Sequence, residues 1–141
     1  MNKYIPQDLL RDALKRLSAS LESFVYIRDC FIKNYSVVCL AGYLLGIGDR
    51  HLENFLLNYS TGEVVSIDFG YSFGQGLSLY LPELMPFRLT RVFQGLTRPV
   101  GLNGIFRHSM IHALSSIRRK RYILLDFCEV HLCLSIQGFH Q

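Results

Sequence analysis

The chain of 141 residues is half hydrophobic and only 18% charged, which excludes intrinsic disorder and a coiled coil as its main state. Its length predicts at most one domain, with enough residues to bury a core. The formal net charge of +4 is uneven, because residues 88–121 contain eight Lys or Arg residues and no acid. Such a run of basic residues can bind nucleic acid or phosphate. We favour the interpretation that it is a solvent-exposed helix end.

The sequence shows neither a membrane span nor a secretory signal. The longest apolar stretch, residues 37–45, is too short to cross a bilayer. The first six residues contain no apolar segment of the kind that a signal peptide requires.

The chain has four cysteines, Cys30, Cys39, Cys128 and Cys133. They form no CxxC pair and lie in apolar segments, so we interpret them as buried, reduced thiols of an intracellular protein. Cys128 and Cys133 flank His131, but this spacing matches no common zinc pattern and disfavours a metal cluster.

The first third of the chain is predicted to be helical. Apolar residues recur at helical spacing over residues 9–17 and again over residues 21–33. Asn34 and Ser36 are candidate caps before a third helix, residues 37–45. This third segment is apolar on all sides, which predicts that it lies inside the core.

The pattern changes after the glycines of residues 46–48. A polar loop over residues 48–54 precedes a short strand, residues 55–57. A turn over residues 59–62 then leads to a second strand, residues 63–69, which is rich in Val and Ile. We expect the two strands to form a β-hairpin.

A long loop with little periodicity follows over residues 70–82, and loops of this length are usually functional. Helical patterns return over residues 89–96, 105–117 and 122–134. The sequence therefore predicts an α+β, mainly helical fold with one small β-hairpin.

Three oxygen-bearing side chains flank this hairpin. Asp49 lies in the polar loop, Asn54 begins the hairpin, and Asp68 lies at the end of the second strand. Because a hairpin folds the chain back on itself, we expect these side chains to converge. Two carboxylates and an amide offer the hard oxygen ligands that Mg²⁺ prefers, together with water and phosphate.

The same spacing is typical of protein kinases. There a loop Asp takes the proton of the substrate hydroxyl, and an Asn five residues later binds a metal ion. The Asp of a D-F-G motif binds metal that bridges the nucleotide phosphates. Here Asp49 and Asn54 are five residues apart, and Asp68-Phe69-Gly70 follows the hairpin. Each motif alone is weak, but their order and the hairpin between them are specific.

The order Asp49-Arg50-His51 differs from the H-R-D of ordinary protein kinases. With residues 46–54 and 67–70, it resembles the phosphatidylinositol 3-kinase-related protein kinases. Residues 82–91 resemble the members of that family that respond to DNA damage. The resemblance covers about residues 9–125, and it implies the C-terminal lobe of a protein-kinase-like fold.

The resemblance implies a role for each site residue in ATP-dependent phosphorylation of Ser or Thr. Asp49 would be the catalytic base or orient the hydroxyl, and His51 would stabilise the transferring phosphoryl group. Asn54 and Asp68 would hold Mg²⁺ and thereby the cofactor ATP. Residues 70–87 would be the activation loop.

The resemblance also implies biological partners. These kinases phosphorylate proteins at Ser or Thr followed by Gln. For the subfamily that residues 82–91 resemble, the resemblance implies a nuclear role in repair of double-strand breaks by non-homologous end joining, with the Ku heterodimer and DNA ends. We expect such contacts to be made by other parts of a longer parent chain, and we expect no membrane association.

The loop over residues 70–84 contains no basic residue. A kinase of anionic inositol lipids needs Lys or Arg there to attract the headgroup, so the loop favours a peptide substrate. Burial of the loop's apolar side chains in a core is the competing interpretation.

Two departures limit the resemblance. The sequence has no glycine-rich phosphate loop and no V-A-I-K-like lysine, so we expect an absent N-terminal lobe and no activity of this chain alone. The tail, residues 126–141, diverges from the family. We therefore treat residues 1–141 as a partial kinase domain. The alternatives are a non-catalytic structural or binding fragment, a lipid kinase lobe, and a DNA-binding module based on the basic run.

Overall fold

The computed structural model describes residues 5–85 and 87–138, with the side chains of residues 131–138 excepted. The suggested ligands His131 and Cys133 therefore lie outside the described side chains, and so does Pro86. The chain divides into two compact units, Met1–Met110 and Ile111–Gln141.

Two helices begin the first unit, α1 (Leu9–Leu17) and α2 (Leu21–Leu45), and they contact each other. The Ser20 hydroxyl accepts a hydrogen bond from the Ser23 amide at 3.1 Å and caps the start of α2. Gly46 ends α2 in the left-handed conformation with φ 57°, which a residue without a Cβ adopts readily.

The prediction of two separate helices, over residues 21–33 and 37–45, is wrong, because α2 runs unbroken from Leu21 to Leu45. The Asn34 side-chain nitrogen donates to the Cys30 carbonyl at 3.0 Å, and the Ser36 hydroxyl donates to the Lys33 carbonyl at 2.7 Å. Both side chains thus bond back within the helix instead of capping a new one. The end of α2 is also less buried than predicted, with Tyr43 63% exposed.

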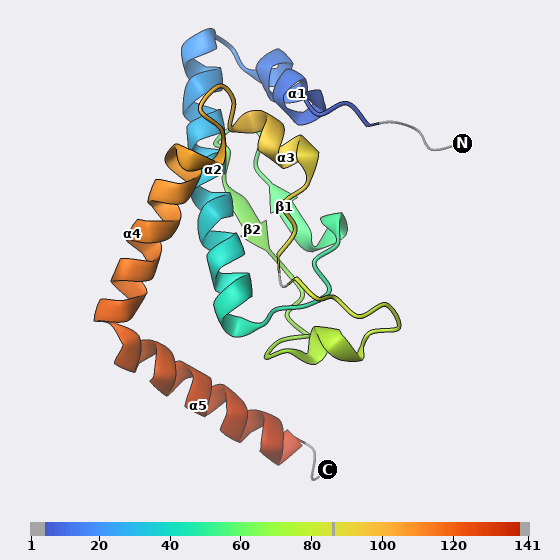
Figure 1. The fold of residues 1–141 in the computed structure, drawn as a ribbon, viewed down its shortest axis with the longest axis vertical. Coiled ribbons are helices and arrows are strands. Elements are labelled where there is room, and N and C mark those ends of the chain that lie inside the picture. Colours follow the sequence, from blue (N-terminus) through green and yellow to red (C-terminus); the bar gives the residue numbers. More distant parts are fainter. Residues whose placement is uncertain (1–4, 86, 139–141) are drawn as a thin grey trace. The chain divides into compact units, whose positions relative to one another are not determined.

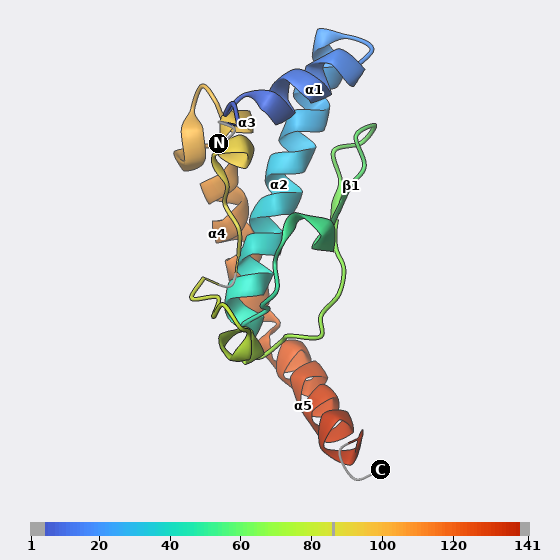
Figure 2. The same cartoon turned by 90° about the vertical axis from the view of Figure 1, so that its right-hand side faces the viewer.

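The predicted hairpin is present but shorter. Strand β1 (Phe55–Leu57) pairs antiparallel with β2 (Val64–Ser66), so that Phe55 lies opposite Ser66. Strand β2 ends before Ile67 because the next two carbonyls accept hydrogen bonds from the side chain of Arg50 rather than from a strand. The hairpin lies alongside α2, which β2 contacts (Figures 1 and 2).

The core of the first unit is centred on the middle of α2. Its buried members are Leu14, Phe24, Ile27, Phe31, Ile32, Tyr35, Cys39, Val64, Leu96 and Phe106. The rings of Phe31 and Tyr35 stack at 5.5 Å between centroids, and Phe93 meets Tyr35 edge-on at 4.6 Å. Burial raises the pKa of the Cys39 thiol to about 12 and also raises that of the Tyr35 hydroxyl.

Helix α3 (Arg91–Leu96) starts two residues later than predicted, where the Thr90 hydroxyl accepts from the Phe93 amide at 3.3 Å. It packs against α1. Helix α4 (Ile105–Arg119) begins in the first unit and contributes Phe106 to the core.

The second unit contains the remainder of α4 and α5 (Arg121–Gly138). Apolar side chains of α5 are exposed, among them Tyr122 at 64% and Phe127 at 72%. No helix within the described residues combines the length and the apolar character that crossing a membrane requires.

The mainly helical α+β class is confirmed, as are free thiols at Cys30, Cys39 and Cys128. Of these three, only Cys39 is buried.

Candidate active site

Two loops meet beyond the C-terminal end of α2. We call residues 46–54 the Asp49 loop and residues 67–85 the Asp68 loop. Backbone hydrogen bonds join them: the Gly74 amide donates to the Gly46 carbonyl at 2.9 Å, and the Gly48 amide donates to the Tyr71 carbonyl at 2.6 Å. A Cβ on Gly48 would lie 2.5 Å from the Gly76 Cα, so the two backbones approach closely enough to require glycine.

Asn54 connects the Asp49 loop to the hairpin. Its side-chain nitrogen donates to the Asp49 carbonyl at 2.7 Å, and its own carbonyl accepts from the Ile67 amide at 3.1 Å. Asn54 is only 6% exposed. Asn54 therefore joins the Asp49 loop to Ile67, the residue before Asp68, through one side-chain and one backbone hydrogen bond.

Asp49 and His51 lie together at the surface. The His51 Nε2 is 3.8 Å from an Asp49 carboxylate oxygen, and their side chains are 43% and 30% exposed, respectively. Asp49 has φ 55°, a left-handed conformation that non-glycine residues adopt infrequently. The pair can therefore present a carboxylate and an imidazole to the same incoming group.

Asp68 also has a left-handed backbone, with φ 57°. One of its carboxylate oxygens accepts a hydrogen bond from the Gly70 amide at 3.2 Å. The residue is exposed, so the carboxylate can reach a ligand from solvent.

The chemistry of this donor set fits Mg²⁺. The Asn54 amide uses its nitrogen as a donor to Asp49, which leaves the amide oxygen as the atom that can coordinate a metal. The exposed Asp68 carboxylate supplies the second oxygen donor. Among the described residues no three His, Cys, Asp or Glu side chains gather as a metal cluster. Two protein oxygens match a Mg²⁺ site completed by water and phosphate oxygens.

Arg50, to which the motifs assigned no role, lies at the centre of the site. It is 4% exposed and donates to carbonyls in both loops: its Nε to Gly48 at 2.8 Å, one terminal nitrogen to Ile67 at 3.1 Å, and the other to Asp68. Its place between Asp49 and His51 was the available signal, but nothing in the pattern showed that the charge is buried.

The Asp68 loop is anchored at its base and exposed beyond it. The Glu83 carboxylate accepts from the Arg50 amide at 3.2 Å, and the Glu83 amide donates to the Gly76 carbonyl at 3.2 Å. Tyr80 is 99% exposed and Leu84 is 83% exposed. Burial of the loop's apolar side chains in a core is therefore not what the structure shows.

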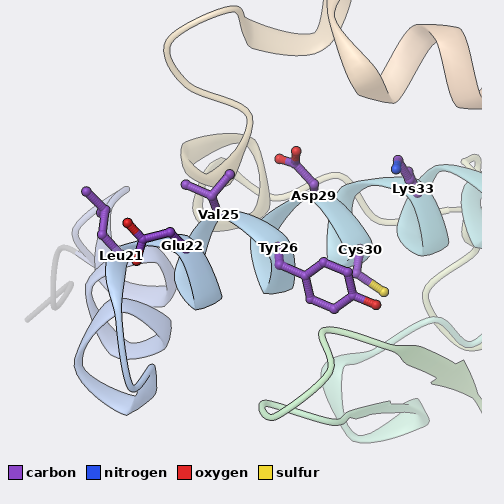
Figure 3. Close-up of a pocket in the computed structure, with 7 residues that line it drawn as sticks. All are labelled: Leu21, Glu22, Val25, Tyr26, Asp29, Cys30 and Lys33. Carbon is purple, nitrogen blue, oxygen red and sulfur yellow. The ribbon is translucent and has the colours of Figure 1, made fainter.

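A separate open hollow of about 600 Å³ lies along α2 (Figure 3). Its lining residues are Leu21, Glu22, Val25, Tyr26, Asp29, Cys30 and Lys33. Figure 3 shows these side chains leaving one helix in different directions, with Asp29 and Lys33 on one side and Tyr26 on the other. No polar groups converge there, so we do not assign it to the site.

Comparison with known proteins supports the kinase resemblance. Residues 2–132 match the family Phosphatidylinositol 3- and 4-kinase. The chain is 44% identical over 127 residues to the DNA-dependent protein kinase catalytic subunit of Gallus gallus. The alignment covers 89% of this chain and 3% of the relative. The chain is also 39% identical over 102 residues to Serine/threonine-protein kinase MEC1 of Candida glabrata, covering 72% and 4%.

A solved structure, "FAT and kinase domain of CtTel1", matches 79% of this chain and 8% of its own with a TM-score of 0.75 and 33% identity. The chain thus spans only a small share, about 3%, of the length of curated relatives such as the Gallus gallus subunit.

Proposed function

The chain belongs to the phosphatidylinositol 3- and 4-kinase family, and on this premise we propose that it is the catalytic lobe of a protein kinase that phosphorylates Ser or Thr with ATP and Mg²⁺. The observation that carries the proposal is that Asn54 bonds both to the Asp49 carbonyl and to the amide of Ile67, the residue before Asp68. The comparisons support the kinase family, and the relatives' names support protein substrates.

In this proposal Asp49 orients the substrate hydroxyl and accepts its proton through its partly exposed carboxylate. His51, 3.8 Å away, donates to the transferring phosphoryl group as negative charge builds on it. Asp49 acts on the attacking hydroxyl and His51 on the phosphoryl group that this hydroxyl attacks, so their proximity is what the chemistry needs.

Asn54 and Asp68 are proposed to hold Mg²⁺ through an amide oxygen and a carboxylate oxygen. When bound, the metal neutralises phosphate charge and aligns ATP for in-line transfer. The chain's own contribution is to fix the two oxygens, Asn54 by its bond to Asp49 and Asp68 by its bond to Gly70.

We further propose that the substrate is a protein rather than an inositol lipid. The exposed part of the Asp68 loop offers the apolar side chains of Tyr80, Leu81 and Leu84 and no base, which suits an uncharged peptide segment. Likeness to the DNA-dependent protein kinase catalytic subunit favours Ser/Thr-Gln sites, a nuclear role in end joining, and Ku and DNA ends as partners of the longer protein.

A metal-binding experiment on the 141-residue chain tests the site. Electron paramagnetic resonance titration with Mn²⁺ and ATP is expected to show saturable binding, weak because no glycine-rich loop or V-A-I-K-like lysine is present in this sequence. Asp68→Asn and Asn54→Ala should abolish it. Asp12→Asn, which removes an exposed charge on α1, should not.

Absence of Mn²⁺–ATP binding in the unmodified chain would favour the alternative, a structural or binding segment without catalysis. Equal binding in Asp68→Asn would contradict the assigned metal site. In a two-lobe parent kinase, Asp49→Ala should abolish transfer to a Ser-Gln peptide, and Cys128→Ala should leave it unchanged. Preferred transfer to phosphatidylinositol vesicles would instead indicate the lipid kinase.

A further inference from the structure

We infer that Arg50 is the residue that positions Asp68, by clamping the Asp68 loop onto the Asp49 loop. The clamp itself is argued from geometry alone. Its consequence for metal binding rests on the proposed function.

The guanidinium of Arg50 connects three backbone carbonyls from two separate parts of the chain. One is in the Asp49 loop, where Nε donates to Gly48 at 2.8 Å. The other two belong to consecutive residues of the Asp68 loop, where the terminal nitrogens donate to Ile67 at 3.1 Å and to Asp68. The bond to Gly48 fixes the guanidinium within its own loop, and the two bonds to Ile67 and Asp68 join the Asp49 loop to the Asp68 loop.

The charge of Arg50 is buried without a carboxylate partner. Its exposed fraction is 4%, and within the part of the chain that the structure describes no acid lies within ion-pair distance of its guanidinium. The group lies instead near the rings of Phe69 and Phe55, at 5.6 and 5.9 Å from the centroids. A buried charge is costly, so its retention indicates a task that a neutral side chain of similar size does not perform.

That task is visible in the backbone of Asp68. Its φ of 57° is uncommon for a non-glycine residue, and such conformations persist only where the surroundings determine them. Arg50 holds the Asp68 carbonyl, while the Gly70 amide holds its carboxylate at 3.2 Å. Together these bonds fix both ends of the residue and hence the direction of the carboxylate.

Lysine cannot replace Arg50 in this arrangement. The planar guanidinium carries donors in a fixed fork that reaches carbonyls on two segments at once, whereas an ammonium is a single point of charge. Arg50→Lys therefore keeps the charge and removes the clamp. The substitution separates positioning from simple electrostatics.

Nuclear magnetic resonance of the 141-residue chain tests the clamp directly. In the unmodified chain the terminal guanidinium protons of Arg50, which donate to Ile67 and Asp68, should be protected from exchange with solvent. In Arg50→Lys the amides of Asp68, Phe69 and Gly70 should change chemical shift and exchange at least about ten times faster. In the same variant Mn²⁺ affinity should fall by about 10–100-fold, the size expected when a residue that orients a metal ligand is lost.

The matched control is Arg28→Lys. Arg28 is also partly buried and donates twice to the Asp29 carboxylate, at 3.0 and 2.7 Å, but it lies on α2 outside the site. Its replacement should leave the Asp68–Gly70 resonances and Mn²⁺ affinity unchanged.

Unchanged Asp68–Gly70 resonances in a folded Arg50→Lys would overturn the inference. So would an equal loss of Mn²⁺ affinity in Arg28→Lys. If Arg50→Lys does not fold, the unmodified chain decides, because rapid solvent exchange of the terminal guanidinium protons of Arg50, which donate to Ile67 and Asp68, contradicts the clamp. If the unmodified chain binds no Mn²⁺, the proposed function fails, and the resonance comparison still decides the role of Arg50.

Discussion

The aromatic core around Tyr35 and the two loops of the candidate site are held together by different forces. In the core, Phe31, Tyr35 and Leu96 are 3%, 2% and 0% exposed, and stacked rings fill the space. At the site, Asp68 is exposed and its backbone is left-handed. The loops are joined by backbone hydrogen bonds and one buried arginine. The two regions therefore depend on different kinds of interaction.

This division has a physical basis. Burying apolar area stabilises a fold without requiring exact directions, so it suits a region whose task is to persist. Hydrogen bonds are directional and contribute less to net stability, so they suit a region whose task is to aim side chains. Substitutions that affect one region and spare the other test the comparison.

The largest expected effect comes from the core. Phe31→Ala should lower the free energy of unfolding by about 3–5 kcal/mol, because it removes a buried ring and leaves a cavity. Urea unfolding followed by circular dichroism measures it. Tyr26→Ala on the same helix is the control: Tyr26 is 70% exposed, and its loss should cost less than about 0.5 kcal/mol. Equal losses would show that the ring stack does not carry the stability.

Gly48→Ala tests the contact between the two loops. Its Cβ would lie 2.5 Å from the Gly76 Cα, and a backbone atom cannot move aside cheaply. We expect a loss of about 1–3 kcal/mol together with shifted resonances across both loops. In Gly74→Ala the new Cβ meets nothing within 4 Å, so only the backbone strain, about 1 kcal/mol, should remain. A Gly48→Ala protein as stable as the parent would contradict this close approach.

Alkaline pH should weaken the core through Cys39. Its pKa is raised from 9.0 to about 12, so above pH 9 the unfolded chain ionises the thiol while the folded chain keeps it neutral. The resulting stability is complete below pH 9 and declines toward pH 12. By about pH 10.5 the free energy of unfolding should have fallen by about 2 kcal/mol from this group. Tyr35 adds a change in the same direction.

Urea unfolding of the parent chain and of Cys39→Ala at pH 7 and pH 10.5 measures this contribution. The variant should lose about 2 kcal/mol less than the parent over that interval. Identical pH dependence in the two proteins would show that Cys39 is not protected from ionisation.

The smallest expected effect separates strain from stability at the site. Asp49 has φ 55°, so Asp49→Gly should be about 1 kcal/mol more stable than Asp49→Ala, since alanine keeps the left-handed penalty. Denaturant unfolding measures the difference. Neither variant should catalyse transfer in a two-lobe parent. An Asp49→Ala chain as stable as Asp49→Gly would show that this backbone is not strained.

Much of the fold follows from the order of residue types. Helical spacing located α1 and α4, and the turn between two β-rich runs located the hairpin, because these signals are local. The local pattern did not predict α2 as a single helix. The side chains of Asn34 and Ser36 can either cap a new helix or bond back to carbonyls of the same helix, as they do here. Only packing around α2 decides between the two.

The sequence by itself determined the family and the candidate chemistry, because the motif around Asp49 and the one around Asp68 stand in a fixed order along the chain. Only the tertiary structure decided how these motifs are joined. The burial of Arg50 and the contact of Gly48 with Gly76 depend on segments that are distant in sequence and adjacent in space. A local pattern records the residue type at each position, but long-range packing sets which charge is buried and which carboxylate faces solvent.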